Sequence, residues 1–222
     1  MAFQVASGSY GLRSSGGSYF PNAASGFSGL IWAKLLTDRD ASSAIFGMKD
    51  SGSGYFYLYN ANSDGTTFSF EDSNGMQLVG PSMVIGTWYC FAWRISTTAD
   101  LWWRTPATPW SSSSGACFID FNPQEIDLGV NGYNHVGGWF PGVVAGLKEW
   151  GYTLSVNQLL AEAEQHVPYT APSSWYPMMD AAPDGGVVVD YGGLARHIPV
   201  IGGFALVDGP PIPWRATGSV SA

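Results

Sequence analysis

The feature that most constrains the fold is a two-residue alternation of side-chain character, repeated in short runs along the chain. The clearest run is "GTWYCFAWRIS" at residues 86–96. Successive side chains of a strand point to opposite faces. One face of this strand would carry Tyr89, Phe91, Trp93 and Ile95, and the other Trp88, Cys90, Ala92 and Arg94. The first set is the more apolar, so we expect it to face the core.

Similar runs recur through the first 150 residues, separated by turns rich in Gly, Ser and Asn. The predicted strands cover residues 27–36, 43–48, 54–60, 66–72, 86–96, 99–106, 116–121, 125–131 and 142–154. Short strands at this spacing, without intervening helices, indicate a sandwich of antiparallel sheets. The 29 glycines suit many tight turns, and 45% hydrophobic with only 12% charged residues argues against a coiled coil or a disordered chain.

A single helix is predicted after these strands. Ser155 and Gln158 match the Ser-x-x-Gln pattern of a capping box, in which each side chain satisfies a backbone N–H at the start of a helix. The following residues, 156–166, have good helix propensity, with Leu159, Leu160 and Ala163 on one side. We expect this helix to cover one edge of the sandwich.

The composition changes at Pro168, where the chain becomes rich in Pro and Gly. Two short strands are expected beyond it, at 186–191 and 202–208. We therefore divide the chain into a β-sandwich, residues 1–168, and a C-terminal segment, residues 169–222. That segment would either supply closing strands or form an assembly arm.

The charge balance restricts the partners. A net charge of −8, with no cluster of Lys or Arg, argues against nucleic acid as a partner. No window approaches the roughly 18 apolar residues of a membrane span, so we expect no membrane partner. The start of the chain shows no secretory signal. Cys90 and Cys117, the two cysteines, are therefore expected to be buried and reduced.

The order of motifs resembles a known family over about residues 18–166. The stretch "GTWYCFAWRI … ADLWWR", followed by "IDLGVNG … WFPGVVAGLKEWGYTLSVNQL", is similar to laminin G-like and concanavalin A-like domains. The matching positions are Gly86, Trp88, Ala92, Gly129, Gly142, Leu154 and Ser155. The resemblance implies an all-β fold: a two-sheet antiparallel jelly-roll sandwich with one short helix after the last core strands.

The stretch "PQEIDLGVNG", 123–132, raises the question of catalysis, because Glu125 and Asp127 would share one face of a strand. Glucanases of the same superfamily resemble it, with E-I-D-x-E or E-I-D-x-x-E, where the last Glu is the acid/base. Here the two positions for that Glu hold Gly129 and Val130. Asp120 and Glu149, the nearest carboxylates in sequence that could replace it, have no support. We therefore expect no enzyme activity.

Aromatic side chains are the remaining candidates for a site. Sugar rings stack on exposed aromatic faces while nearby polar groups fix their hydroxyls. The candidate carbohydrate-binding residues are Trp102, Trp110, Tyr133, Asn134 and Trp139. Core packing or a subunit contact is an equally open role for them. No cofactor is expected, although oxygen-rich turns at 38–43 and 62–65 could hold calcium.

These observations favour a non-enzymatic structural protein of a phage-like virion, either a capsid decoration or a tail-associated protein. Such a protein would be made in the host cytoplasm, would pair with identical copies or other virion proteins, and could also bind surface glycans. The alternative is a secreted or surface carbohydrate-binding module or lectin, and a glucanase is the weakest reading. The first two are compatible.

Overall fold

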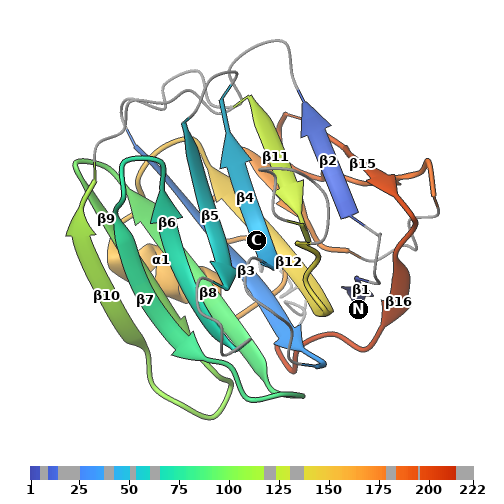
Figure 1. Ribbon diagram of the computed structural model, residues 1–222, viewed down its shortest axis with the longest axis horizontal. Coiled ribbons are helices and arrows are strands. Elements are labelled where there is room, and N and C mark those ends of the chain that lie inside the picture. The colour runs from blue at the N-terminus through green and yellow to red at the C-terminus, as the bar shows by residue number, and fades with distance from the viewer. Residues whose placement is uncertain are drawn as a thin grey trace, which may run out of the picture.

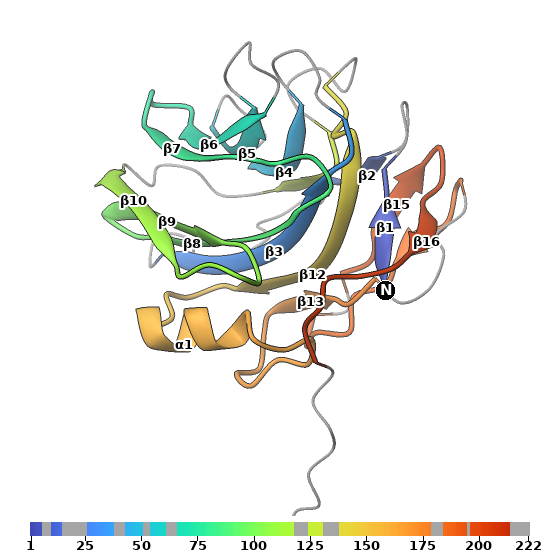
Figure 2. The same ribbon diagram turned by 90° about the horizontal axis from the view of Figure 1, so that it is seen from below.

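The computed structural model shows two antiparallel sheets stacked face to face, with the helix outside one of them (Figures 1 and 2). It describes residues 1–5, 10–14, 26–37, 43–50, 54–60, 66–117, 124–130, 138–178, 184–194 and 196–213, without the side chains of 12–14. The predicted all-β sandwich with one short helix is confirmed. In the described part of the chain, no helix is long and apolar enough to cross a membrane.

Each sheet has eight strands. Sheet A runs in the order β10 (Ser111–Ala116), β9 (Thr98–Arg104), β8 (Trp88–Ile95), β3 (Phe27–Leu35), β12 (Gly142–Trp150), β1 (Ala2–Gln4) and β16 (Ala205–Val207), with β13 (Ser174–Tyr176) also on β12. Sheet B runs in the order β14 (Val187–Val188), β15 (Ile198–Ile201), β2 (Tyr10–Ser14), β11 (Glu125–Leu128), β4 (Ala44–Lys49), β5 (Tyr55–Asn60), β6 (Thr67–Asp72) and β7 (Gln77–Ser82).

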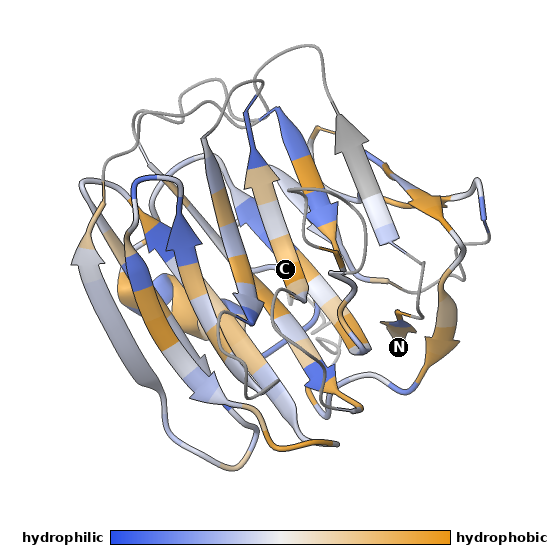
Figure 3. Ribbon diagram, in the orientation of Figure 1, coloured by the Kyte–Doolittle hydropathy of each residue, from blue (hydrophilic) through white to orange (hydrophobic). Residues whose placement is uncertain are grey.

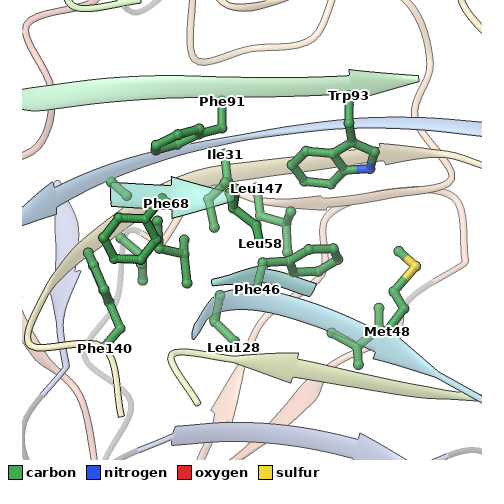
Figure 4. Close-up of a cluster of buried hydrophobic side chains, with 14 of the residues drawn as sticks. Ile31, Phe46, Met48, Leu58, Phe68, Phe91, Trp93, Leu128, Phe140 and Leu147 are labelled. Carbon is green, nitrogen blue, oxygen red and sulfur yellow. The ribbon is translucent and has the colours of Figure 1, made fainter. Parts of the chain in front are cut away.

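The main core lies between the sheets and is dominated by aromatic rings (Figure 4). The face of β8 that we predicted to point inward does so: Tyr89, Phe91, Trp93 and Ile95 are all buried there. Trp93 of sheet A stacks on Phe46 of sheet B, with ring centroids 5.0 Å apart and an angle of 23°. Hydropathy alternates along β5, β6 and β11 of sheet B, as the period-two pattern requires (Figure 3).

The opposite face of sheet A is buried as well, which the alternation did not predict. Trp88, Cys90 and Ala92 belong to a second apolar cluster with Trp32 and Trp150. The helix α1 (Val156–Glu162) covers this face (Figure 2) and contributes its apolar side to the cluster. Sheet A is therefore the middle layer of three, and β12 is buried along its whole length.

A buried ion pair fastens the helix to sheet A. Lys148 of β12 donates from Nζ to the carboxylate of Glu162 at 3.3 Å and to the backbone oxygens of Glu162 and Gln165 at 2.6 and 2.8 Å. Glu162 in turn accepts from the backbone N–H groups of Tyr169 and Thr170. At the other end, the predicted capping box of the helix is present. Burial lowers the pKa of Lys148 to about 8.

The C-terminal segment supplies strands to both sheets. In sheet A, β13 pairs with β12 and β16 pairs with β1, while in sheet B β15 pairs with β2 and β14. The described part of this segment, up to residue 213, thus provides closing strands (Figure 1). The expected strands at 186–191 and 202–208 are present in shortened form as β14 and β16, whereas β13 and β15 were not predicted.

Most strand boundaries in the first 150 residues agree with the prediction to within a few residues. The differences concern short or polar strands. The serine run 111–116 forms β10, ahead of the strand predicted at 116–121, of which residues 118–121 lie outside the described part. The strands β1, β2 and β7 were not predicted.

Replacing Lys148 by Ala should lower the free energy of unfolding by about 3–5 kcal/mol, because the carboxylate of Glu162 is left buried without its cation. The double change Lys148→Met with Glu162→Leu should recover part of this loss, since it removes both charges but also the partners of four backbone groups. Urea denaturation measures both. A loss below about 1 kcal/mol in Lys148→Ala would show that the ion pair does not hold the helix.

Acid should weaken the fold through His166, which is 3% exposed. Burial, with help from the nearby amino terminus, lowers the pKa of His166 from 6.5 to about 4. The folded protein keeps His166 neutral, whereas the unfolded chain takes up a proton there below pH 6.5. The stabilisation that His166 contributes is therefore complete above pH 6.5, and about 3 kcal/mol of it is lost as the pH falls towards 4. The stability of His166→Gln should therefore fall less steeply than that of the wild type over this range. Parallel curves would contradict the assignment.

Candidate functional site

The candidate site lies on the outer face of sheet B and begins with the strand β5. Its sequence alternates strictly: Phe56 and Leu58 point into the core, so Tyr55, Tyr57 and Tyr59 point outward. The ring centroids of Tyr55 and Tyr57 are 5.1 Å apart. One strand thus places a row of three phenol groups on the side of the sheet away from the core.

Carboxylates on the neighbouring strands receive these phenol groups. Glu71 of β6 accepts hydrogen bonds from both Tyr55 and Tyr59, and Asp127 of β11 accepts one from Tyr57 at 3.5 Å. The strand order β11, β4, β5, β6 makes this possible, since it puts an acidic strand on each side of the tyrosines. The carboxylate of Glu125 pairs with Lys49 at 2.7 Å. We call this set the tyrosine–carboxylate face: Lys49, Tyr55, Tyr57, Tyr59, Glu71, Glu125 and Asp127.

A glycine allows the central ring to lie flat against the sheet. Gly47 of β4 is the cross-strand neighbour of both Tyr57 and Asp127. A Cβ atom at Gly47 would lie 2.1 Å from two ring carbons of Tyr57, closer than any real contact allows. The ring of Tyr57 therefore covers the backbone of β4 and reaches Asp127 on the strand beyond.

The electrostatics of the face keep its phenols neutral. Burial, followed by the charge of Asp127, raises the pKa of Tyr57, and burial with the hydrogen bond to Glu71 raises that of Tyr59. Both hydroxyls therefore stay protonated and donate to the carboxylates. Tyr57 and Asp127 are buried and form the floor, while Tyr55, Tyr59 and Glu71 are partly exposed. Three carboxylates and one lysine leave the face with an excess of acceptors.

The three predicted site residues that the structure describes, Trp102, Trp110 and Trp139, do not lie together. Trp102 is 9% exposed, in the cluster under α1, with the guanidinium of Arg94 5.7 Å from its ring centroid. Trp110 is half-buried beside the same cluster, and Arg104 lies over its ring at 4.9 Å. Both tryptophans therefore lie on the outer side of sheet A, with their rings covered by neighbours.

Trp139 lies on the other side of the molecule from these two. It forms isolated bridges to Ala44, at the start of β4, and to Val130, after the end of β11. It is half-buried and belongs to the same sheet as the tyrosine–carboxylate face. Tyr133 and Asn134 lie outside the described residues.

The prediction that Glu125 and Asp127 share a face is confirmed, because Ile126 and Leu128, which alternate with them, are in the core. Gly129, directly after β11, has a positive φ of 77°, and Val130 is buried. Of the two other carboxylates that we considered, Glu149 is on β12 of the opposite sheet and Asp120 is outside the described part.

Neither metal chemistry nor thiol chemistry has an obvious place in the described residues. They contain no group of three or more His, Cys, Asp or Glu that could hold a metal. The candidate calcium turns, 38–43 and 62–65, fall almost entirely outside them. Both cysteines are buried and free, as predicted, and burial raises the pKa of Cys117 to about 12 and that of Cys90 as well.

The tyrosines were missed, although the sequence carried a signal for them. The run "GYFYLYN" was predicted as a strand, and its alternation alone puts the three tyrosines on one face. What the sequence could not supply was the identity of the flanking strands. Glu71 is 12 residues from Tyr59 and Asp127 is 70 residues from Tyr57, so their meeting depends on the topology.

Comparison with known proteins identifies the fold. No model of a known protein family matches the chain, and no curated protein sequence matches it. Among solved structures, a protein from Bacteroides ovatus to which carbohydrate binding has been ascribed is similar over 96% of this chain, with 15% identity and a TM-score of 0.68. The chain spans 61% of the length of that protein.

Two further solved structures show weaker likenesses. Domains LG4–5 of the mouse laminin α1 chain cover 72% of this chain and 44% of their own, with 12% identity and a TM-score of 0.49. Tailspike protein 2 of bacteriophage CBA120 is similar over 68% of this chain and 25% of its own chain, with 12% identity and a TM-score of 0.48. The likeness over 96% of the chain supports the two-sheet antiparallel sandwich that was predicted from its motifs.

Replacing Gly47 by Ala should displace the ring of Tyr57 from the floor of the face. The added methyl group overlaps two ring carbons, so we expect a loss of about 1–3 kcal/mol in the free energy of unfolding. The matched control is Gly193→Ala, where nothing lies within 4 Å of the new methyl group. Equal stability of the two variants in urea denaturation would show that Tyr57 does not lie across β4.

Proposed function

We propose that this chain is a non-enzymatic carbohydrate-binding protein whose ligand sits on the tyrosine–carboxylate face. The observation that carries the proposal is the pairing of partly exposed phenol rings with carboxylates already held in place by hydrogen bonds. The apolar face of a sugar ring packs on an aromatic ring, while its hydroxyls donate to fixed acceptors. Tyr55, Tyr59 and Glu71 supply both contacts from two adjacent strands.

The charge of the face selects among glycans. Glu71, Glu125 and Asp127 outnumber Lys49, whose ammonium group is already paired with Glu125. A sulfated or sialylated glycan would bring further negative charge against these carboxylates. We therefore propose a neutral glycan, rich in hydroxyl donors.

The same geometry supports a binding role over a hydrolytic one. Glycoside hydrolysis commonly needs two carboxyl groups on opposite sides of the scissile bond. Here Glu125 is engaged with Lys49 at 2.7 Å, and Asp127 is fully buried and bound by Tyr57. The two positions directly after the strand hold Gly129 and Val130. The fold shared with the Bacteroides ovatus protein adds support of a general kind, at the level of architecture.

Attachment to a phage-like virion is our second proposal, and it is compatible with glycan binding. It rests on the low proportion of charged residues, 12%, and on the free thiols of Cys90 and Cys117, which suit a chain folded in a reducing cytosol. Labelling of purified phage-like particles from the source with an antibody raised against this chain tests it. Bound antibody supports the proposal, and unlabelled particles beside abundant free protein argue against it.

The double change Tyr55→Ala with Tyr59→Ala should weaken binding to a neutral glycan at least tenfold, which is about 1.4 kcal/mol, because it removes both exposed rings. A glycan array identifies the ligand, and titration calorimetry measures the affinity. Tyr169→Ala is the matched control, since this exposed tyrosine lies beyond α1 on the far side of sheet A. An array with no signal from well-folded protein, or equal losses in both variants, would overturn the proposal.

A further inference from the structure

The four sheet edges differ in how well they are protected from pairing with another chain. In sheet B, β14 has two residues, and β7 contains Pro81 and pairs with β6 through a register shift. In sheet A, β16 has three residues. Short strands, prolines and bulges are the usual means of preventing edge-to-edge association. Three of the four edges therefore carry such protection.

The fourth edge, β10, carries none of it. Its six residues pair with β9 in unbroken register, and no described residue pairs with its other side (Figure 1). The strand reads Ser-Ser-Ser-Ser-Gly-Ala, without charge or proline, and most of it is exposed. A straight, neutral and accessible edge offers its free N–H and C=O groups to another strand.

The sequence of β10 is compatible with pairing to itself. A two-fold axis at Ser113 would place Ser112 opposite Ser114 of a second copy and Ser111 opposite its Gly115, so that only small side chains meet. At each end Trp110, which packs beside the cluster under α1, would face the exposed Ala116 of the other copy. Residues directly opposite in this register lie on the same face of the joined sheet.

Charge does not oppose this contact, although the chain as a whole carries −8. The charged side chains nearest to β10 are already paired within the chain. Arg94 binds Asp100 at 2.7 Å, and Arg104 binds Glu164 at 2.7 Å. The strand itself contributes no charge, so two copies would meet there without like-charge repulsion.

We infer that β10 pairs antiparallel with β10 of a second copy of this chain, joining the two sheets A into one continuous sheet. The two-fold axis is perpendicular to the joined sheet, so the same face of sheet A points to the same side in both copies. The two tyrosine–carboxylate faces, which lie on sheet B, then point in one direction. This last consequence rests on the proposed function: two sites facing one way would bind a surface bearing many glycans more tightly than one site does.

Light scattering on the full chain tests the contact. The wild type should show twice the chain mass of 23.7 kDa, whereas Ser112→Lys with Ser114→Lys should lose the dimer, because the new ammonium groups face each other across the axis. Ile201→Lys with Ala205→Lys, which adds the same charge to exposed positions at the far edge, should remain dimeric. A monomeric wild type at all concentrations, or a dimeric Ser112/Ser114 variant, overturns the inference.

Cross-linking tests the register separately. Cα atoms directly opposite in antiparallel strands are about 4.5–5.5 Å apart, within the range that a disulfide spans. Ser112→Cys with Ser114→Cys should therefore form covalent dimers under mild oxidation, while each single variant should not. Cross-linking by the single variants, or none by the double variant, contradicts the register. Neither experiment uses a glycan, so failure of the proposed ligand leaves these results standing, and the reverse holds too.

Discussion

The stacking of aromatic rings between the two sheets fixes the register on which the rest of the molecule depends. Phe46 and Phe70 of sheet B both lie against Trp93 of sheet A, and Phe56 stacks on Phe70. Because side chains alternate strictly along a strand, a slip of one residue in β5 would exchange its buried and outward sets. The burial of Phe56 in the core therefore also keeps the three tyrosines of β5 on the outer face.

The burial of both faces of sheet A marks the limit of what alternation in the sequence can predict. The pattern in β8 identified the inner face correctly, but it left open what lies on the other face. That face is covered by α1 and the residues after it, and the buried ammonium group of Lys148 joins them to β12. The sequence around Lys148 does not indicate which residues will bind its ammonium group. Those residues, Glu162 and Gln165, lie 14 and 17 positions further along the chain.

Part of the candidate site could likewise be predicted from single strands, whereas the rest depends on how distant strands pair. The outward row of tyrosines follows from residues 54–60 alone, and the shared face of Glu125 and Asp127 from four residues. Their meeting required β11, β4, β5 and β6 to lie in that order. The surroundings of the tryptophans depend on distant information too: Arg94 lies over the ring of Trp102, and Arg104 lies over that of Trp110.

The glycine beneath Tyr57 has a consequence for how the face can change over evolutionary time. The ring of Tyr57 packs on the backbone of β4, which fixes its rotamer. The shape of the floor is therefore set before any ligand binds, and binding costs little side-chain entropy there. Any larger residue at position 47 would lift that floor. Tyr55 and Tyr59 are partly exposed, and their cross-strand neighbours on β4 are Lys49 and Ala44 in place of a glycine. Substitutions that keep the fold are therefore expected at the rim, while the centre is expected to stay unchanged.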